Sequence, residues 1–406
     1  MKPRVVIIGQ GYTGRLSIVR SVAGMGCDIT LIVLCSHKTF ARRRVKIRKP
    51  LDAYSKYVGE VFYSENYNDT MLMDILLNHC VCPGQKNFII PDNDYSAAAV
   101  DRYRDRLSEY FYCPNIHEEA GAVEAWMDKV RQKTLAKQLG LNVVNSVLIE
   151  IKNRQYLIPD SIQYPCFVKP LLSINGGKSA LKKCNSEKAL RNHIANVLTM
   201  RDDVDILVEE FKSIEKEYAT LGFSDGEEVI IPGLLELLKI GHGSHFGVAV
   251  QGRVFPTTGF EDLVGKFKRM VQEIGFVGIF DFDFFMSGGE MYFCELNLRF
   301  GGSGYAFTRM GVNLPVMMMK FFRGESLDGL QKTISGEATY FNERMAMDDW
   351  YLGYISTEEF CKTKAESDIR FIESADDPVP QEMLEKEYKI KRIKRVIKQC
   401  LGMKYR

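Results

Sequence analysis

The stretch from Gly278 to Gly304, GIFDFDFFMSGGEMYFCELNLRFGGSG, constrains this chain more than any other part of it. It contains two largely apolar runs, 279–286 and 291–298, which are separated by the short segment 287–289, Ser-Gly-Gly. Two such runs joined by a short glycine turn predict an antiparallel β-hairpin. The chain is therefore expected to build a largely apolar sheet around this hairpin.

Polar side chains recur at alternate positions of the hairpin, at Asp281, Asp283, Glu295, Asn297 and Arg299. Alternate residues of a strand face the same side of a sheet, so the polar residues of each strand share a face. Isolated charges are costly on buried strands, whereas clustered oxygen ligands suit Mg²⁺ between carboxylates and nucleotide phosphates. A guanidinium beside them could neutralise a transferring phosphoryl group. The alternative is the exposed polar face of an edge hairpin.

This pattern resembles the ATP-grasp ligases, which carry an acidic or amide residue on one strand and Glu-x-Asn-x-Arg on the next. The resemblance implies that Asp283, Glu295 and Asn297 bind two Mg²⁺ ions, or Mn²⁺ in their place, on the triphosphate of ATP. It also implies that Arg299 is catalytic. Leu298 stands where many members of the family have proline.

The same resemblance assigns lysines and glycines to the phosphates. Lys169 ends the strand predicted over 164–170 and is expected to be catalytic at the triphosphate. Gly176 and Gly177 follow in a loop that lets backbone amides approach phosphates, although the P-loop pattern is absent. Lys129 lies in a helix predicted over 122–139, where the family places a triphosphate contact. An ordinary surface lysine would fit that position equally well.

The adenosine end is expected where the strand over 205–211 ends. Backbone groups of Glu209, Glu210 and Phe211 resemble the hinge that reads the adenine edge. The resemblance implies that Glu217 is the ribose ligand, because it lies seven residues beyond Glu210, as the ribose-binding glutamate does in the family. A carboxylate can accept hydrogen bonds from both hydroxyls of a diol. Glu215 is the competing candidate, since strand alternation places it on the same face.

The N-terminus also carries a nucleotide-like motif. A strand over 4–8, the segment 9–14 (GQGYTG), a helix and a second strand over 28–34 match the Rossmann GxGxxG pattern. The second strand ends in Cys-Ser-His without the acid that binds a ribose hydroxyl, although the arginines at 42–44 could meet a 2′-phosphate. A nicotinamide site is therefore one interpretation. A tight turn in a Rossmann-like domain that holds no nucleotide is the other.

Composition narrows the class of protein. The 406 residues are 46% hydrophobic and carry a net charge of +2, which favours a globular protein of two or three domains that does not bind nucleic acid. No apolar run approaches the roughly 20 residues of a transmembrane helix, and no signal peptide is recognisable. The ten cysteines lack the spacing of zinc or redox motifs. A cytoplasmic protein is expected.

The expected architecture is α/β, with α+β character in the grasp subdomains. It comprises a Rossmann-like domain over 1–116, the two ATP-grasp subdomains over 117–203 and 204–325, and a C-terminal extension over 326–406. The extension ends in a basic helical stretch that begins near Tyr388. Such a helix could dock on the protein itself or lie on an anionic membrane surface.

The resemblance implies an ATP- and Mg²⁺-dependent carboxylate–amine ligase that forms an amide or peptide bond through an acyl phosphate. Its substrates would be a small carboxylate and an amine, expected to be amino acids, and a homodimer is left open. The layout is closest to D-aspartate ligase-type enzymes, on loose motifs at 54–57, 91–95 and 376–378. The alternatives are an NAD(P)-dependent oxidoreductase, a carbamoyl-phosphate synthetase-like enzyme that forms carboxyphosphate, and a nucleotide-binding protein without turnover.

Overall fold

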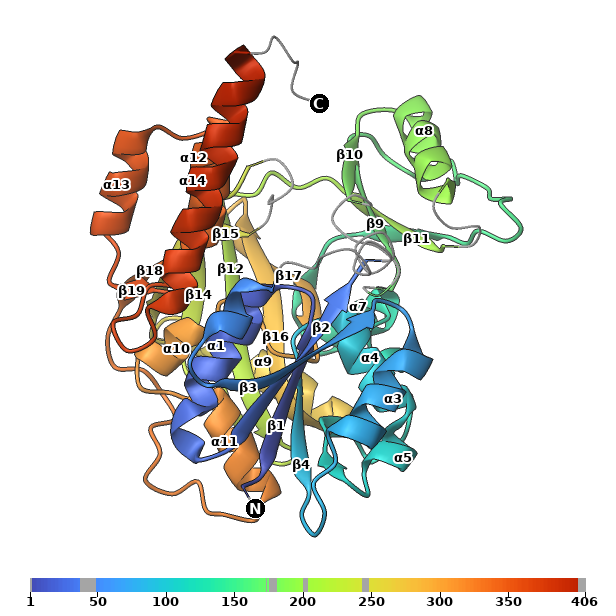
Figure 1. The fold of residues 1–406 in the computed structure, drawn as a ribbon. Coiled ribbons are helices and arrows are strands. Elements are labelled where there is room, and N and C mark those ends of the chain that lie inside the picture. Colours follow the sequence, from blue (N-terminus) through green and yellow to red (C-terminus); the bar gives the residue numbers. More distant parts are fainter. Residues whose placement is uncertain are drawn as a thin grey trace.

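The computed structural model describes residues 2–36, 49–172, 174, 181–199, 204–242 and 248–400, which form three β-sheets with their covering helices (Figure 1). The fold is mixed α/β, as the sequence predicts. The first sheet is parallel, in the strand order β3-β2-β1-β4-β5. This is the order of a Rossmann-like domain.

The first sheet has nearly continuous apolar strands because helices cover both of its faces. Its strands are β1 (Arg4–Gly9), β2 (Asp28–Cys35), β3 (Val58–Glu65), β4 (Asn87–Pro91) and β5 (Phe111–Tyr112). Its helices are α1 (Tyr12–Val22), η1 (Ala23–Met25), η2 (Leu51–Tyr54), α3 (Asp69–His79), α4 (Asp94–Arg102) and α5 (Arg104–Leu107).

The second sheet is antiparallel and stands apart from the main body at the upper right of Figure 1. Its strands, in spatial order, are β10 (Lys182–Cys184), β9 (Cys166–Pro170), β11 (Ile206–Glu210) and β8 (Ser146–Ile149). Helix α8 (Glu187–Leu198) packs on it through Leu190, Ile194 and Val197, a spacing that places these residues on one face of the helix.

The third sheet has ten strands and holds the predicted hairpin, β16 (Phe276–Ser287) and β17 (Glu290–Asn297). Its other strands are β6 (Asn115–Ile116), β7 (Asn142–Val143), β12 (Lys216–Asp225), β13 (Val229–Ile230), β14 (Leu234–Ile240), β15 (Ala249–Phe255), β18 (Ala338–Phe341) and β19 (Ile369–Arg370). Helix α9 (Glu261–Ile274) covers it, with Phe267 stacked on Phe282 of β16 at 4.2 Å between ring centroids.

The predicted helix over 122–139 is two helices, α6 (Ala122–Ala125) and α7 (Lys129–Gln138). The break has a local cause. Asp128 caps α7, because its carboxylate accepts hydrogen bonds from the N–H groups of Val130 and Arg131 at 2.7 and 3.0 Å. The cap starts α7 at Lys129 and so determines where that lysine points.

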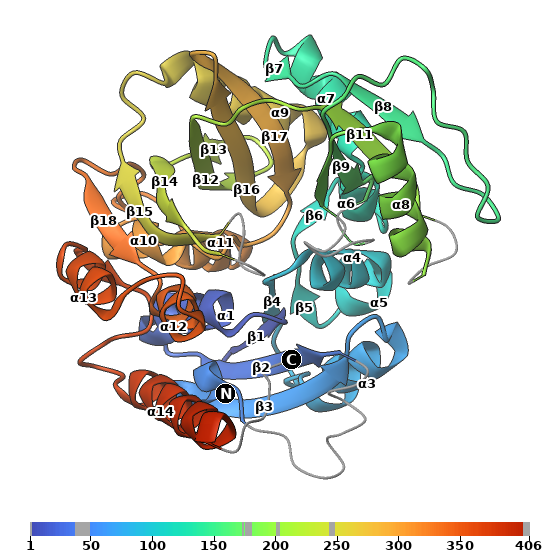
Figure 2. The same ribbon diagram turned by 90° about the horizontal axis from the view of Figure 1, so that it is seen from above.

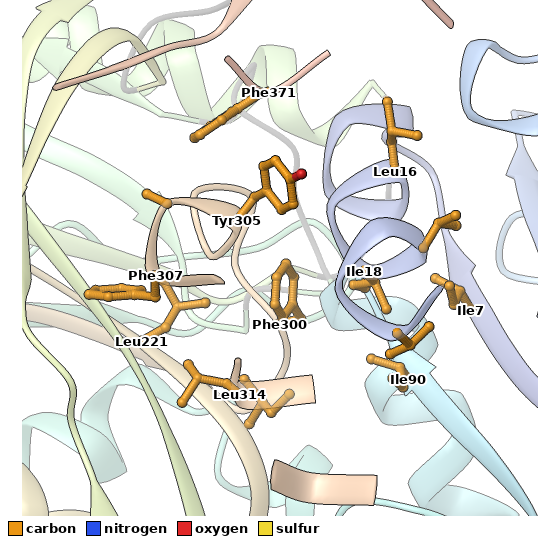
Figure 3. Close-up of a cluster of buried hydrophobic side chains, with 14 of the residues drawn as sticks. Ile7, Leu16, Ile18, Ile90, Leu221, Phe300, Tyr305, Phe307, Leu314 and Phe371 are labelled. Carbon is orange, nitrogen blue, oxygen red and sulfur yellow. The ribbon is translucent and has the colours of Figure 1, made fainter. Parts of the chain in front are cut away.

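One apolar core joins the first sheet to the third (Figure 3). Leu16 and Ile18 of α1 face Phe300 and Tyr305, which follow the hairpin; Tyr305 lies in α10 (Tyr305–Arg309). Leu314 opens α11 (Leu314–Phe322), which closes this core from below. The first sheet is therefore packed directly against the segment that follows the polar hairpin.

The C-terminal residues continue the third sheet, because β18 pairs with β15. The predicted boundary at 325/326 therefore divides a continuous sheet. It stays a prediction, like the other domain boundaries. Helices α12 (Glu343–Leu352) and α13 (Thr357–Ala365) lie at its edge, whereas α14 (Val379–Cys400) lies beside the first sheet (Figure 2). In the described part of the chain, no helix has the length and apolar character that a membrane crossing needs.

Helix α14 docks on the protein mainly through its first half. Its first half docks on the protein, with Leu384 and Tyr388 buried and the Tyr388 hydroxyl donating to Asp348. Its second half projects from the body in Figure 1, and Ile393 and Ile397 are 59% and 52% exposed.

Candidate active site

The register of the hairpin brings its polar residues together. β16 and β17 pair across the turn 288–289, whose glycines both have positive φ, as a two-residue hairpin turn favours. Asp283 lies opposite Glu295, and Asp281 lies opposite Asn297. Residues directly opposite in an antiparallel pair face the same side. The four side chains therefore form one polar cluster on one face of the third sheet.

The two aspartates of this cluster have raised pKa values. Burial, followed by the Asp281 and Glu295 carboxylates, raises the pKa of Asp283 well above its ordinary value. Burial likewise raises the pKa of Asp281 to about 6, although Arg299 opposes the shift. Asn297 donates from Nδ2 to Oδ2 of Asp283 at 3.3 Å. Without more positive charge, the cluster favours protonated carboxyls.

Helix α7 supplies one of the cations. The Lys129 side chain is 5% exposed, and its Nζ lies 3.3 Å from Oε2 of Glu295. Burial opposes ionisation of Glu295, but Lys129 and Lys169 outweigh it and hold the pKa of Glu295 below its ordinary value. Gln132, one turn further along α7, exchanges two hydrogen bonds with the backbone of Leu296 at 2.8 and 2.9 Å. This contact fixes the helix against β17 beside Glu295.

The second sheet brings a buried ion triad to the same site. Glu209 of β11 pairs with Lys169 of β9 at 2.8 Å and also with Lys133 of α7. Burial opposes the charge on Glu209, but Lys169 and Lys133 outweigh it and keep its pKa below the ordinary value. Two lysines thus share one carboxylate, so the triad carries a net positive charge. This suits a neighbouring polyphosphate.

The hinge predicted at the end of β11 is built differently from expectation. The Glu209 side chain is occupied by the lysines, while Glu210 pairs with Lys212 at 2.8 Å. The N–H of Glu210 donates to the carbonyl of Asn145, and that of Phe211 donates to Pro165. Those two amide donors are used within the protein. The assignment of Glu209, Glu210 and Phe211 to adenine therefore stays a prediction. Because two of the amide donors are engaged, we expect backbone carbonyls to provide most of the hydrogen bonds to the adenine.

Glu217 lies on the same face as the polar cluster. β12 pairs with β16 so that Ala219 is opposite Asp283, and Glu217 is opposite Phe285. Residues two apart on a strand are about 6.6 Å apart, so Glu217 sits one step from the Asp283 row. The competitor Glu215 accepts a hydrogen bond from the N–H of Gly288 at 2.7 Å, which ties it to the hairpin turn. The choice of Glu217 as the ribose ligand stays a prediction.

Arg299 joins the cluster to the first sheet. β17 ends at Asn297, yet the Arg299 guanidinium still reaches Asp281, with Nη1 3.3 Å from Oδ2. Its Nε donates to Oδ1 of Asp94 at the start of α4, at 2.9 Å. The two acids hold the guanidinium at the junction of the first and third sheets.

The GxGxxG turn is filled by a carboxylate. A Cβ placed on Gly9 would lie 2.7 Å from Oδ2 of Asp92, and one placed on Gly14 would lie 2.0 Å from Oδ1. Burial raises the pKa of Asp92 to about 7, although Arg15 opposes the shift. The small residues of this motif therefore accommodate Asp92, and a phosphate would meet that side chain in the space a dinucleotide needs. The nicotinamide interpretation is not favoured.

Some predicted positions fall outside the described residues, namely Gly176 and Gly177 of the glycine loop and the arginines at 42–44.

The donor set of the hairpin fits Mg²⁺. The two carboxylates Asp283 and Glu295 and the amide oxygen of Asn297 are hard ligands, and Mg²⁺ commonly takes its remaining ligands from substrate phosphates and water. Among the described residues, the buried Oδ1 of Asp281 has no hydrogen-bond partner. In the same part of the chain, no three His, Cys, Asp or Glu side chains could hold a metal ion alone. The site thus suits a metal that arrives with phosphates, and Mn²⁺ would meet the same ligands.

The protein has a mixed α/β fold in which a cluster of lysines and carboxylates lies where the second and third sheets meet. Residues 134–313 match the model of the ATP-grasp domain. The chain therefore contains an ATP-grasp domain, as its sequence resemblance predicts.

The comparison with curated proteins gives a partial match. The carbamoyl phosphate synthase large chain of Clostridium acetobutylicum is 23% identical over 241 residues, which cover 56% of this chain and 22% of that protein. The chain spans about a fifth of the length of the carbamoyl phosphate synthase large chains that it matches.

Solved structures show the same fold. An N5-carboxyaminoimidazole synthetase from Staphylococcus aureus, complexed with ADP, has a TM-score of 0.60 at 18% identity and covers 93% of this chain and 92% of its own. An L-amino acid ligase from Bacillus licheniformis has a TM-score of 0.58 at 16% identity, with coverages of 83% and 79%. At such identities the likeness shows the fold alone.

Sequence reasoning missed several residues of the site. Lys133 and Gln132 follow Lys129 on α7 and are visible as a polar stripe, but surface helices have the same pattern. Asp92 and Asp94 follow β4, where the carboxyl ends of parallel strands commonly carry site residues. Their place just after a predicted parallel strand could have indicated both aspartates as candidate site residues.

Proposed function

We propose that this protein is an ATP- and Mg²⁺-dependent ligase that joins a carboxylate to an amine through an acyl phosphate. The observation that carries the proposal is the cross-strand pair Asp283–Glu295, which lies with Lys129 and Lys169 on one side and Arg299 on the other. Two metal-ligand carboxylates bordered by three cations are the requirement for holding a triphosphate and stabilising phosphoryl transfer.

Each group has a role that its position permits. Asp283, Glu295 and Asn297 would hold Mg²⁺, which neutralises phosphate charge when it is bound. Lys129 and Lys169 bind the triphosphate, and Glu209 keeps the Lys169 ammonium in place. The adenosine lies toward Glu217, one strand step from the metal ligands. This order along the sheet directs the γ-phosphate toward Arg299.

The reaction then has two steps. A substrate carboxylate oxygen attacks the γ-phosphorus, the bond to the β-phosphate oxygen breaks, and ADP leaves. The amine nitrogen attacks the acyl carbon, its proton passes to solvent or to a nearby base, and inorganic phosphate leaves. Arg299 stabilises the charge on the moving phosphoryl group from its place between Asp94 and Asp281. The chemistry requires no covalent protein intermediate.

The substrates are proposed to be amino acids. The support is the fold shared with an L-amino acid ligase, together with the site at the junction with the first sheet, where a small molecule would lie beside Arg299 and Asp94. The nine described cysteines are free, as is usual in the reducing cytoplasm, where ATP and amino acids are abundant. A homodimer remains a proposal, motivated by the dimer of a biotin carboxylase domain with the same fold.

A second candidate is formation of carboxyphosphate from bicarbonate. The sequence similarity to carbamoyl phosphate synthase large chains and the fold of N5-carboxyaminoimidazole synthetase favour it. The two candidates differ only in the carboxylate that receives the phosphoryl group.

Hydroxylamine distinguishes the candidates. The full chain is incubated with ATP, Mg²⁺, hydroxylamine and single amino acids, and hydroxamate, ADP and AMP are measured. We expect ADP and a hydroxamate that depends on one particular amino acid. ADP release that depends on bicarbonate alone would identify carboxyphosphate. Release of AMP and pyrophosphate with the correct substrates would mean adenylation and would overturn both candidates.

A further inference from the structure

A cavity of about 830 Å³ lies at the junction of the first and third sheets, away from the candidate active site. Its walls come from β5 and α5, from the segment after β6, from the start of β16 and from the end of α11. Val277 lines it, whereas the metal ligand Asp283 lies six residues further along β16. At about 3.3 Å per residue this is a separation of about 20 Å. The volume is in the range of small-molecule sites.

A buried arginine faces this cavity. The Arg104 side chain is 9% exposed, so it is more than nine-tenths buried. In the described part of the chain its guanidinium has one ion pair, with Glu118 at 3.5 Å, and no side-chain hydrogen bond. Glu118 is itself 84% exposed, so it provides weak compensation for a buried charge. The buried Asp101 carboxyl also interacts with Arg104, whose charge opposes the rise that burial causes in the pKa of Asp101. A guanidinium with a single long ion pair has donors left for a carboxylate, which it can bind through two parallel hydrogen bonds.

The rim has the opposite charge. Asp105, Glu118 and Glu227 line the cavity and are exposed, while Lys86 is the exposed cation among its lining residues. A ligand that placed an anion on Arg104 would therefore meet carboxylates at the mouth. Such an arrangement favours a positive group on the outer part of the same ligand.

The remaining wall is aromatic. Tyr112 and Phe322 stack at 5.5 Å between ring centroids, and Phe321 adjoins Phe322 at 5.7 Å. All three rings line the cavity and are half-buried. Half-exposed aromatic rings beside a charged group commonly bind apolar or planar ligand groups.

The backbone at the mouth is held in an uncommon conformation. His117 and Glu118 are consecutive non-glycine residues with φ of 49° and 58°. A Cβ on Gly275 would lie 2.2 Å from the His117 ring, so that ring is packed tightly against the start of β16. Residues held in this region cluster at ligand-binding segments. The conformation places Glu118 over Arg104.

We infer that this cavity binds a free amino acid with a large apolar or aromatic side chain. The α-carboxylate would pair with Arg104, the α-ammonium with Glu118 and the acidic rim, and the side chain with the Tyr112–Phe322 wall. The ligand would bridge the first sheet to the start of the strand that carries the metal ligands. This site stands independently of the proposed reaction, because it shares none of the residues assigned to that reaction.

Isothermal titration calorimetry on the full chain tests the inference with three probes that differ by one group: L-tryptophan, indole-3-propionate and tryptamine. We expect saturable one-to-one binding of L-tryptophan. Each analogue should bind at least tenfold more weakly, a difference of about 1.4 kcal/mol. Arg104→Gln should weaken L-tryptophan at least tenfold, whereas Arg106→Gln, an exposed arginine of the same helix, should not.

Two further variants separate the sites. Glu118→Gln should weaken L-tryptophan but leave indole-3-propionate unchanged, and it changes only an exposed side chain, so it serves if Arg104→Gln does not fold. Glu295→Gln should bind L-tryptophan as the wild type does, because Glu295 belongs to the other site. Absence of L-tryptophan binding, binding that survives Arg104→Gln, or equal binding of all three probes would overturn the inference.

Discussion

Arg299 and Asp94 are 205 positions apart in the chain, yet Nε of the arginine donates to Oδ1 of the aspartate at 2.9 Å. Asp94 belongs to the first helix after β4, and Arg299 follows the hairpin of the third sheet. Next to Arg299, Phe300 packs in the apolar core that joins α1 to this segment (Figure 3), and this packing holds the two elements together. We therefore propose that Asp94 positions the guanidinium, from a helix of the first sheet, which holds none of the proposed nucleotide ligands.

This contact predicts that Asp94→Asn lowers kcat about tenfold and leaves KM for ATP within about twofold. The amide can still accept a hydrogen bond, but it loses the charge that strengthens the contact, which is worth about 1.5 kcal/mol or more. Steady-state kinetics measures the split, and Asp74→Asn, an exposed acid of α3, is the matched control. A rise in KM for ATP with unchanged kcat would show that Asp94 acts on nucleotide binding instead.

Glu295→Gln should abolish turnover while the fold survives. Glu295 is the carboxylate opposite Asp283 and beside Lys129, and an amide cannot neutralise cations there. The loss should be at least ~3 kcal/mol of transition-state stabilisation, by analogy with other electrostatic groups. Initial rates and circular dichroism are compared with those of Glu290→Gln, an exposed glutamate at the start of the same strand. Activity above a tenth of wild type at matched Mg²⁺ would exclude Glu295 as a metal ligand.

Mg-ATP should raise the melting temperature, and NADPH should not, because a ligand stabilises the folded state that binds it. Lys169→Ala should reduce the effect of Mg-ATP, because it removes one of the two lysines that pair with Glu209 and with it a proposed triphosphate ligand. Gly11→Ala should leave it unchanged, because a Cβ there meets nothing within 4 Å. Thermal unfolding with each nucleotide measures the shifts. A shift with NADPH that Gly11→Ala removes would move the nucleotide to the first sheet.

Unlike Gly11, Gly14 packs directly against Asp92, so its substitution should affect stability. Gly14→Ala should destabilise the protein by about 1–3 kcal/mol, because the new Cβ would lie 2.0 Å from Oδ1 of Asp92 and the packed turn must open. Denaturant unfolding measures the difference. The double variant Gly14→Ala/Asp92→Ala should recover part of the loss, and a double variant no more stable than Gly14→Ala alone would show that Asp92 is not the cause.

The carboxylate cluster predicts a pH dependence of metal binding. Asp281 has a pKa of about 6, above its ordinary value of 3.8, and the pKa of Asp283 is also raised. Between about pH 4 and pH 6, these two aspartates are therefore largely protonated in the folded protein but ionised in the unfolded chain. Without metal, stability due to these groups is therefore present below about pH 4 and is lost as pH rises through about 6.

Since Mg²⁺ binds the ionised form, its affinity should rise over the same interval, with release of protons. Titrations with Mg-ADP between pH 5 and 8, in buffers of different ionisation enthalpy, measure the proton release. Asp283→Asn should reduce that release, whereas Asp262→Asn, an exposed aspartate of α9, should leave it unchanged. An affinity that is flat across this interval would show that the cluster is already ionised.

Much of the fold could be predicted from local patterns. The hairpin, its turn at 288–289 and the shared face of Asp283 and Glu295 follow from strand alternation and glycine turn chemistry. The parallel first sheet follows from its apolar strands and intervening helices. The helix over 122–139 was wrong at Asp128, because a capping aspartate inside a polar helix pattern resembles any other exposed acid.

The residue types of the candidate site and their period of two can be predicted from short segments, because both are local properties of the chain. Which charges meet depends on how the elements pack. Glu209 takes Lys133 and Lys169 as partners, Asp94 holds Arg299, and Asp92 occupies the glycine turn that otherwise resembles a dinucleotide site. These contacts join residues that are far apart in the chain, and local periodicity does not encode which elements lie together. The shared core packs the first sheet against the third and so brings Asp94 to Arg299, and the cost of burying an unpaired charge favours such pairs.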